Sequence, residues 1–399
     1  MNNRSENVWL RRLRNLPHSI KNISRMLWHP LKQLSLLVWN TFLLLIYSVK
    51  ELGYSILNKV GLLSNETLSS FKGLYYRDKE KNFLILLLCL PASIVFAFKN
   101  HKWVKKFFFA LIPKLGMFYQ HDPTIISCDY SLTKKTSTAA EPLNLVVITP
   151  SFEQAEFIKR TIDSVINQGY SNITYIVQDG GSKDGTVEIL RGYSEGQIIW
   201  ESVNDNGQTE ALNLGVEKLQ DWDIMCYLNS DDLLLPGSIN FVIEFFNRHP
   251  TVDVVYGNRL MIDEQDGCIG EWVLHGHNDF VLSYADYIPQ ETMFWRKTIW
   301  DRAGATFDES FRFAMDWDLI LRFRQAGAKF VHIPQFLGAF RIHEAQKTQS
   351  IIGEVGDVEM DRLRKRELGY LPTSSENFVN ALPFLVRHVL ADFKYRYLK

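Results

Sequence analysis

The sequence predicts an α/β protein, in which a mostly parallel sheet is flanked by helices and preceded by a helical, membrane-associated amino-terminal region. After Pro142, short apolar runs rich in β-branched residues alternate with amphipathic helical patterns, as in parallel sheets. Before Pro142, the chain is basic and contains two long apolar runs. We therefore expect four segments, which are a basic, apolar region (1–121), a linker (122–141), an α/β domain (142–348) and a helical tail (349–399).

Charge is distributed unevenly along the 399 residues. Up to Lys135 the chain has 20 Lys and Arg residues against 7 Asp and Glu residues, whereas the rest has 24 against 38. A basic region joined to an acidic one suggests two units with different partners. The basic unit suits nucleic acid or anionic lipid, and its apolar runs favour lipid. We therefore expect a membrane surface as partner and no nucleic acid.

The two apolar runs, 33–49 and 82–98, each have 17 residues. This length is at the lower limit for a helix that crosses a bilayer. Basic and aromatic residues flank the runs, as at a cytoplasmic membrane interface, so a two-helix hairpin would leave the α/β domain on the cytoplasmic side. Helices that lie in one leaflet, or core helices of a soluble domain, are the alternatives. The polar stretch 122–141 predicts a linker.

The α/β domain begins with strands and helices in regular order. Apolar, β-rich runs predict buried strands at 143–150, 173–179, 198–203 and 223–228. Apolar residues at helical spacing predict helices at 155–168, near 187–190, at 208–219 and from 316 onward. In the tail, residues 382–399 predict a basic, aromatic, amphipathic helix, which either lies at a membrane interface or packs on the domain.

Polar side chains follow three of the predicted strands, where ligands of parallel sheets bind. They are Thr149, Pro150 and Ser151 after the first strand, Asp179 after the second, and Ser230, Asp231 and Asp232 after a later one. Carboxylates would repel a nucleotide diphosphate unless a hard divalent cation such as Mn²⁺ or Mg²⁺ lay between them. One aspartate could instead accept a hydrogen bond from a base or a ribose. Taken singly, each motif is also explained by a turn or a helix cap.

The stretch from about Leu143 to Thr348 resembles the family 2 glycosyltransferases, which have the GT-A fold. The motifs are VVITPSFEQAEFIKRTIDSVINQGY, YIVQDGGSKDGTVEIL, VNDNGQTEALNLG, YLNSDDLLLPGSI, IPQETMFWRK, FDESFRFAMDWDLILRF and FRIHEAQKT, which together are very specific. The resemblance implies an inverting transfer of a sugar from a UDP-, GDP- or dTDP-sugar. A glycan or lipid-linked acceptor at the membrane, in the synthesis of cell-surface polysaccharide or glycolipid, is expected with it.

The resemblance also implies roles for single residues. Asp316 would be the general base, and Asp232 a direct metal ligand that is joined by Asp231 and His343. The donor-binding residues would be Thr149, Pro150, Ser151, Glu153, Asp179, Asp205, Gln208, Asp231, Gln290 and Glu291. Asp316 and Asp318 begin one predicted helix about 200° apart, so both cannot serve one proton. The second carboxylate would then be a first-turn residue favoured by the helix dipole.

Two positions depart from the family pattern. Asn229 stands where Asp is common, and a neutral amide is a weaker metal ligand. Met315 stands where Glu often precedes the base. These departures motivate one alternative, a non-catalytic subunit of a membrane assembly that binds nucleotide-sugar or glycan. A sugar nucleotidyltransferase is a second alternative, but TPSFEQAEF lacks the Gly-rich, basic phosphate loop expected of one.

Overall fold

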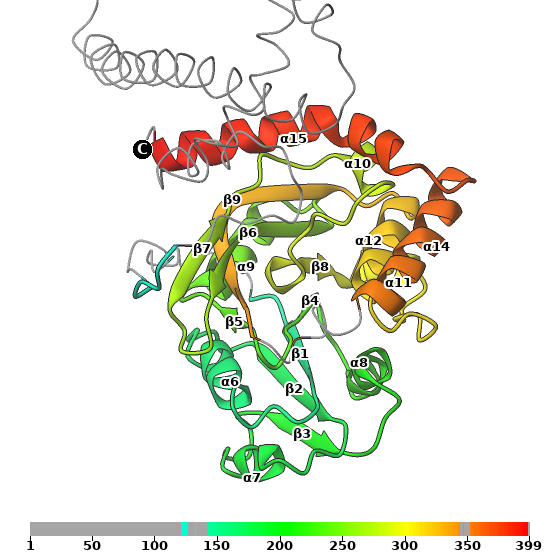
Figure 1. Cartoon of the computed structure of the whole chain (residues 1–399). Helices are drawn as coiled ribbons and strands as arrows, with labels where there is room; N and C mark the ends of the chain where they lie inside the picture. The colour runs from blue at the N-terminus through cyan, green and yellow to red at the C-terminus, as the bar shows by residue number, and fades with distance from the viewer. Residues whose placement is uncertain (1–120, 127–131, 133–141, 344–345, 347–351, 398–399) are drawn as a thin grey trace, which may run out of the picture. The chain divides into compact units, whose positions relative to one another are not determined.

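The computed structural model describes residues 121–126, 132, 142–343, 346 and 352–397 (Figure 1). All of them belong to one compact unit, Phe109–Lys399. The two apolar runs of the amino-terminal region and most of the expected linker lie outside the described residues. Among the helices that are described, none combines the length and the apolar character needed to span a bilayer.

The strands of the described chain form one nine-stranded sheet with the order β3-β2-β1-β4-β8-β6-β9-β5, and β7 pairs with β6. Its first half consists of β1 (Leu145–Ser151), β2 (Ile173–Asp179), β3 (Ile199–Ser202) and β4 (Ile224–Tyr227). These four strands pair in parallel, as predicted. Their carboxyl ends therefore meet at one edge of the sheet.

The second half of the sheet corrects the prediction of a mostly parallel arrangement. It consists of β5 (Leu233–Leu234), β6 (Val254–Ile262), β7 (Cys268–Trp272), β8 (Phe294–Arg296) and β9 (Phe330–Arg341). β8 is antiparallel to both β4 and β6, β7 is antiparallel to β6, and β5 is antiparallel to β9, whereas β6 and β9 are parallel. The short turn between β6 and β7 forces a hairpin, so the sheet is mixed. A mixed sheet flanked by helices fits the expected GT-A fold.

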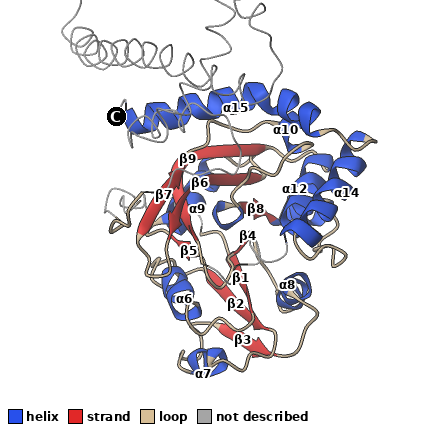
Figure 2. Cartoon of the chain, in the orientation of Figure 1, coloured by secondary structure: helices blue, strands red, loops and turns tan. Residues whose placement is uncertain are grey.

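Helices cover both faces of the parallel half, and α6 and α8 lie on opposite sides of β1 and β2 (Figure 2). The side chains of alternate residues of β1 point to opposite faces of the sheet. Leu145 and Val147 pack with α6 and α9, and Val146 and Ile148 pack in the cluster that includes α8 and α12. The helices are α6 (Ile158–Ile166), α7 (Thr186–Arg191), α8 (Gln208–Glu217), α9 (Ser238–Arg248), α10 (Asp279–Leu282), α11 (Lys297–Arg302) and α12 (Met315–Gln325).

Helix α8 approaches β1 closely because it has a glycine at the contact. A Cβ at Gly215 would lie 2.7 Å from Cγ2 of Ile148, nearer than two carbon atoms can approach. The position of α8 matters for function because its first turn contains Gln208, one of the predicted donor-binding residues. The glycine thus helps to set the distance between this turn and the end of β1.

The carboxy-terminal residues form a π-helical turn (Ile352–Gly356) and the helices α14 (Asp357–Leu368) and α15 (Ser374–Tyr397). Glu359 of α14 accepts hydrogen bonds from the backbone N–H groups of residues 312, 313 and 314, at 2.8 to 2.9 Å. These groups directly precede α12, so a buried carboxylate fixes the loop that leads to Asp316. The tail is therefore part of the framework of the domain.

Candidate active site

A cavity of about 1280 Å³ lies at the carboxyl ends of β1 and β4. Nine of the thirteen residues predicted for the site line it. They are Pro150, Ser151, Asp205, Gln208, Asp231, Asp232, Gln290, Glu291 and Asp316. These residues come from strand ends, loops and helix starts that are up to 166 positions apart in the sequence. The fold thus gathers most of the predicted set around one space.

The other four predicted residues lie outside the lining of the cavity. Thr149 is buried, and its hydroxyl lies 3.0 Å from the hydroxyl of Tyr175. Asp179 is also buried, and His343 lies behind Asp231 with its Nε2 atom 3.0 Å from Oδ2 of Asp231. Glu153 is exposed in a left-handed conformation with φ of 52°. Their roles in donor or metal binding stay predictions.

The carboxylate of Asp179 organises the loop that follows β2. It accepts hydrogen bonds from the N–H groups of Gly181 and Ser182 and from the hydroxyls of Ser182 and Ser202, at 2.6 to 3.1 Å. A Cβ at Gly180 would lie 2.9 Å from Oδ2 of Asp205, so glycine is needed for this approach. The Asp-Gly-Gly motif therefore brings the loop of Asp205 against the end of β2.

The loop after β1 is joined to the loop after β2 through backbone donors. The N–H groups of Glu153, Gln154 and Ala155 donate to the side chains of Ser182, Thr186 and Asp184, at 2.7 to 2.9 Å. These donors lie in the loop before the helix, and α6 begins at Ile158 rather than at the predicted residue 155. The two loops form a single rim beside Ser151.

Ser151 contributes a hydroxyl without a partner among the described residues. Its side chain is buried and lines the cavity, and its Oγ atom has no hydrogen bond there. Buried hydroxyl groups are nearly always hydrogen-bonded, because desolvation without a partner costs free energy. The hydroxyl is therefore a candidate for hydrogen bonding to a polar ligand in the cavity.

The acidic turn at Ser230, Asp231 and Asp232 is held from two sides. The hydroxyl of Thr161, on α6, lies 2.8 Å from the carbonyl oxygens of both Ser230 and Asp232. The backbone N–H of Arg341, on β9, donates to Oδ1 of Asp232 at 3.0 Å, and its Nε donates to the carbonyl of Asp231 at 2.7 Å. The carboxylates are thus fixed at the floor of the cavity before any ligand binds.

Asn229 links this turn to two predicted donor-binding residues. Its Oδ1 accepts from Nε2 of Gln208 at 2.7 Å, and its Nδ2 donates to Oδ2 of Asp232 and to Oε1 of Gln290, each at 3.3 Å. An aspartate, the common residue of the family here, could not donate to Asp232. The side-chain amide of Asn229 therefore joins Gln208, Asp232 and Gln290 in a way that a carboxylate could not.

Several charged residues of the cavity lining were missed from the sequence, and Arg259 and Asp286 are two of them. Arg259 forms a bidentate ion pair with the buried Glu291, with N–O distances of 2.7 and 2.5 Å. Asp286 lines the cavity together with Asp316. Burial, and secondly the charge of Asp316, raises the pKa of Asp286 well above its ordinary value. Arg259 had a signal, since it is a charge within the apolar strand VVYGNRLMI, whereas Asp286 had none.

The acidic floor has the chemistry of a divalent cation site. Burial raises the pKa of Asp232 well above its ordinary value, and the charges of Asp231 and Glu291 raise it further. A cation beside these oxygens would offset that repulsion, and carboxylates with an imidazole suit Mn²⁺ or a similar ion. The ligand atoms are not all gathered at one point, because Oδ1 of Asp232 faces the N–H of Arg341. In the described residues, a tight group of three potential ligands occurs elsewhere, at His121, Cys268 and Glu271.

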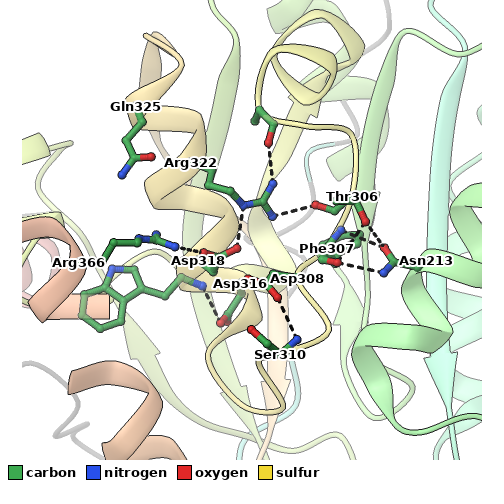
Figure 3. A network of polar contacts seen from close by, with 12 residues as sticks. Asn213, Thr306, Phe307, Asp308, Ser310, Asp316, Asp318, Arg322, Gln325 and Arg366 are labelled. Carbon is green, nitrogen blue, oxygen red and sulfur yellow. Dashed lines mark hydrogen bonds and ion pairs between the residues drawn. The ribbon is translucent and has the colours of Figure 1, made fainter. Parts of the chain in front are cut away.

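The carboxylates at the start of α12 have different surroundings (Figure 3). Asp316 lines the cavity. Asp318 is fully buried, and its oxygens pair with Nε of Arg322 at 2.8 Å and with Nη1 of Arg366. The helical period separates the two side chains, as predicted. Asp318 therefore binds helix α12 to α14, and Asp316 is the carboxylate that can reach a ligand.

Residues 146–307 match the family model described as glycosyl transferase family 2. The chain therefore contains a family 2 glycosyltransferase domain. As such it uses a nucleotide-sugar donor, and the cavity at the strand ends is its candidate active site.

Relatives of this glycosyltransferase occur in several bacteria. An uncharacterized glycosyltransferase of Rickettsia typhi is 26% identical over 251 residues, which cover 59% of this chain and 77% of the relative. The chondroitin synthase of Escherichia coli is 25% identical over 192 residues, or 47% of this chain and 27% of the relative. Among solved structures, S. aureus TarS 1-349 in complex with UDP-GlcNAc has a TM-score of 0.48 and 16% identity, covering 64% of this chain and 76% of that chain.

Proposed function

We propose that this glycosyltransferase is an inverting, metal-dependent enzyme whose acceptor is a glycan or lipid-linked molecule at the cytoplasmic face of a membrane. One observation carries the proposal, namely that the cavity has an acidic turn, Ser230 to Asp232, on its floor and a separate carboxylate, Asp316, in its lining. The two carboxylate groups come from different elements, so one can serve the donor while the other serves the acceptor.

The donor would occupy the side of the cavity formed by the ends of β1 and β4. Ser151 offers an unused hydroxyl there, and Gln208 and Gln290 offer amides that are already oriented by Asn229. Asp231 and Asp232, with His343 behind Asp231, would hold Mn²⁺ or Mg²⁺. Such a cation supplies positive charge that stabilises the leaving nucleoside diphosphate. UDP-, GDP- and dTDP-sugars are the donors to test.

Asp316 would act on the acceptor. Inversion requires a single displacement, in which the acceptor hydroxyl attacks the anomeric carbon from the face opposite the diphosphate. The carboxylate of Asp316 takes the proton of that hydroxyl as the new bond forms, while the bond to the diphosphate oxygen breaks. Its backbone is fixed by Glu359 through the preceding loop, which favours one orientation of the base.

The acceptor and the location rest on the amino-terminal third of the sequence. Its basic residues and its two apolar runs suit an anionic membrane surface. A membrane-bound enzyme with a cytoplasmic active site would have nucleotide sugars on one side and lipid-linked glycans beside it. Synthesis of cell-surface polysaccharide or glycolipid is the process that these features support.

Calorimetry on the full chain tests the donor side of this proposal. We expect one of UDP, GDP and dTDP to bind, and to bind more tightly with Mn²⁺ than with EDTA. In the variant Asp232→Asn the advantage of Mn²⁺ should disappear, whereas Asp163→Asn, which changes a carboxylate of α6 outside the cavity, should keep it. Nucleotide binding that is indifferent to the metal in the unmodified chain would overturn the metal-dependent mechanism.

A further inference from the structure

Helix α15 is fixed to the domain by its inner face. Ala381, Phe384 and Leu385 are at most 5% exposed, and the ring of Phe384 packs on those of His275 and Tyr287 with centroids 4.4 Å apart. Farther along, Arg396 pairs with Glu271 and donates to its carbonyl. Contacts near both ends thus set the rotation of α15 about its axis, so its outer face has one defined orientation.

The outer face of α15 is apolar and exposed. Phe378, Val379, Val386 and Leu390 are 49%, 63%, 47% and 61% exposed, and the partly buried Leu382 lies between them. Residues 378, 382, 386 and 390 recur every four positions, so their side chains form one stripe along the helix. Contiguous apolar patches on the surface of a folded domain mark interaction sites when they are large.

The stripe continues onto neighbouring elements. Phe280 of α10 is 56% exposed, and Tyr370 and Leu371, between α14 and α15, are 46% and 52% exposed. α10 contacts α15, and the two helices lie next to each other in Figure 1. The apolar area therefore extends around the beginning of α15, with several large side chains on one side of the domain.

Positive charge accompanies this apolar area. Arg387 and Lys394 are exposed next to the stripe, at positions that follow Val386 and Leu390. The carboxylate of Asp392 lies 2.8 Å from the guanidinium of Arg396, so it does not offset them. Apolar side chains with adjacent cations complement an anionic lipid interface, in which the chains enter the acyl boundary and the cations meet the headgroups.

We propose that the outer face of α15, with Phe378, Val379, Val386 and Leu390 as its apolar stripe, binds the interfacial region of an anionic lipid bilayer. Charge favours a lipid bilayer over two other possible occupants of this face, namely the amino-terminal third of the chain and a second copy of the protein. The amino-terminal third is basic, and a second copy has the same two cations beside its stripe, so either occupant would add positive charge to a face that already has Arg387 and Lys394. The inference deepens the proposed membrane location by naming the surface in contact, and it rests on that part of the proposed function.

An environment-sensitive fluorophore on the stripe tests the proposal in the full chain. The fluorophore NBD is attached at Val386→Cys, and in a matched control at Ser194→Cys. Ser194 is exposed and follows α7 by three residues, and α7 lies at the opposite end of the described domain from α15 (Figure 1). Cys89 and Cys128 are replaced by Ser in both proteins. Vesicles contain either phosphatidylcholine alone or phosphatidylcholine with phosphatidylglycerol.

We expect a blue shift and stronger emission at position 386 with the anionic vesicles, quenching there by nitroxide-labelled lipid, and no change at position 194. The response should weaken when Arg387 and Lys394 are replaced by Gln. Vesicle binding of the chain without a response at 386 would overturn the proposal, as would the same blue shift without vesicles. The readout needs no sugar transfer, so its failure is distinguishable from failure of the enzymatic proposal.

Discussion

Asp316 and Asp318 lie in the same first turn of α12, yet Asp316 lines the cavity and Asp318 is buried between Arg322 and Arg366. Two residues along a helix correspond to about 200° of rotation, which places the carboxylates on different faces. One sequence motif, MDWDL, thus contains a group that can reach the acceptor and a group that joins α12 to α14.

Replacing these two residues separates chemistry from stability. Asp316→Asn should lower kcat by about 10² to 10⁴, the usual contribution of a general base, because the amide cannot take the proton of the acceptor. Donor affinity should stay unchanged, and the unfolding temperature should not fall, because the loss of this charge relieves repulsion with Asp286. Initial rates, calorimetry and thermal unfolding of the full chain measure the three quantities.

Asp318→Asn is the matched control, which should lower stability and leave kcat unchanged. It weakens the two ion pairs of a fully buried carboxylate whose arginine partners are partly exposed, so the loss should approach, but not exceed, the cost of about 3–5 kcal/mol for breaking a fully buried pair. The activity of each folded molecule should be retained. Equal losses of kcat in the two variants, at equal stability, would contradict the assignment of the base to Asp316.

Ser151→Ala tests the unused hydroxyl. Removing a buried hydroxyl that has no partner should leave the free energy of unfolding unchanged or raise it by about 1 kcal/mol, while nucleotide binding weakens. Thr161→Val is the comparison, because its hydroxyl bonds to two carbonyls of the acidic turn and its loss should cost about 1–3 kcal/mol. A lower free energy of unfolding in Ser151→Ala than in the unmodified chain would show that the hydroxyl has a partner within the protein.

The pair of Arg259 and Glu291 should behave as a unit. Arg259→Met leaves a buried carboxylate without its cation and should lower the free energy of unfolding by about 3–5 kcal/mol. Adding Glu291→Gln should recover part of that loss, because the isolated charge is removed. A double-mutant cycle by denaturant unfolding gives the coupling, and strictly additive effects would mean that the pair is not coupled.

Asp286 gives a dependence of stability on pH. Burial and the charge of Asp316 raise its pKa, so the folded state holds this proton more tightly than the unfolded state does. Stability is therefore lost as the pH rises from the ordinary Asp pKa of about 4 toward the raised value. Asp286→Asn should unfold at a higher temperature than the unmodified chain at pH 8, and the difference should vanish below pH 4. An Asp286→Asn variant that is less stable than the unmodified chain at pH 8 would contradict a raised pKa of Asp286.

The parallel half of the fold was predictable from local sequence. Buried parallel strands need continuous apolar runs, and their polar ends lie at the binding edge, which is why Ser151, Asp231 and Asp232 line one cavity. Thr149 does not line the cavity. It shares a strand face with Val147, and the alternation of side chains along β1 turns it away from the cavity toward Tyr175.

The remaining features depend on contacts between distant residues. β8 has three residues and lies between β4 and β6, so its antiparallel pairing could not be inferred from its own sequence. Glu359 fixes backbone groups that lie about 46 positions earlier, and Arg259 finds its partner 32 positions later. Local patterns do not contain such pairings, because they arise when the sheet and the helices assemble.

The most direct test of the account is the release of nucleotide from a donor sugar by the full chain, with a membrane extract as the source of acceptor. UDP-, GDP- and dTDP-sugars are compared with Mn²⁺ and with EDTA, for the unmodified chain and for Asp316→Asn. We predict release from one class of donor that requires both Mn²⁺ and the carboxylate of Asp316. Release that persists in Asp316→Asn, or that is equally fast in EDTA, would contradict a metal-dependent transfer with Asp316 as the base.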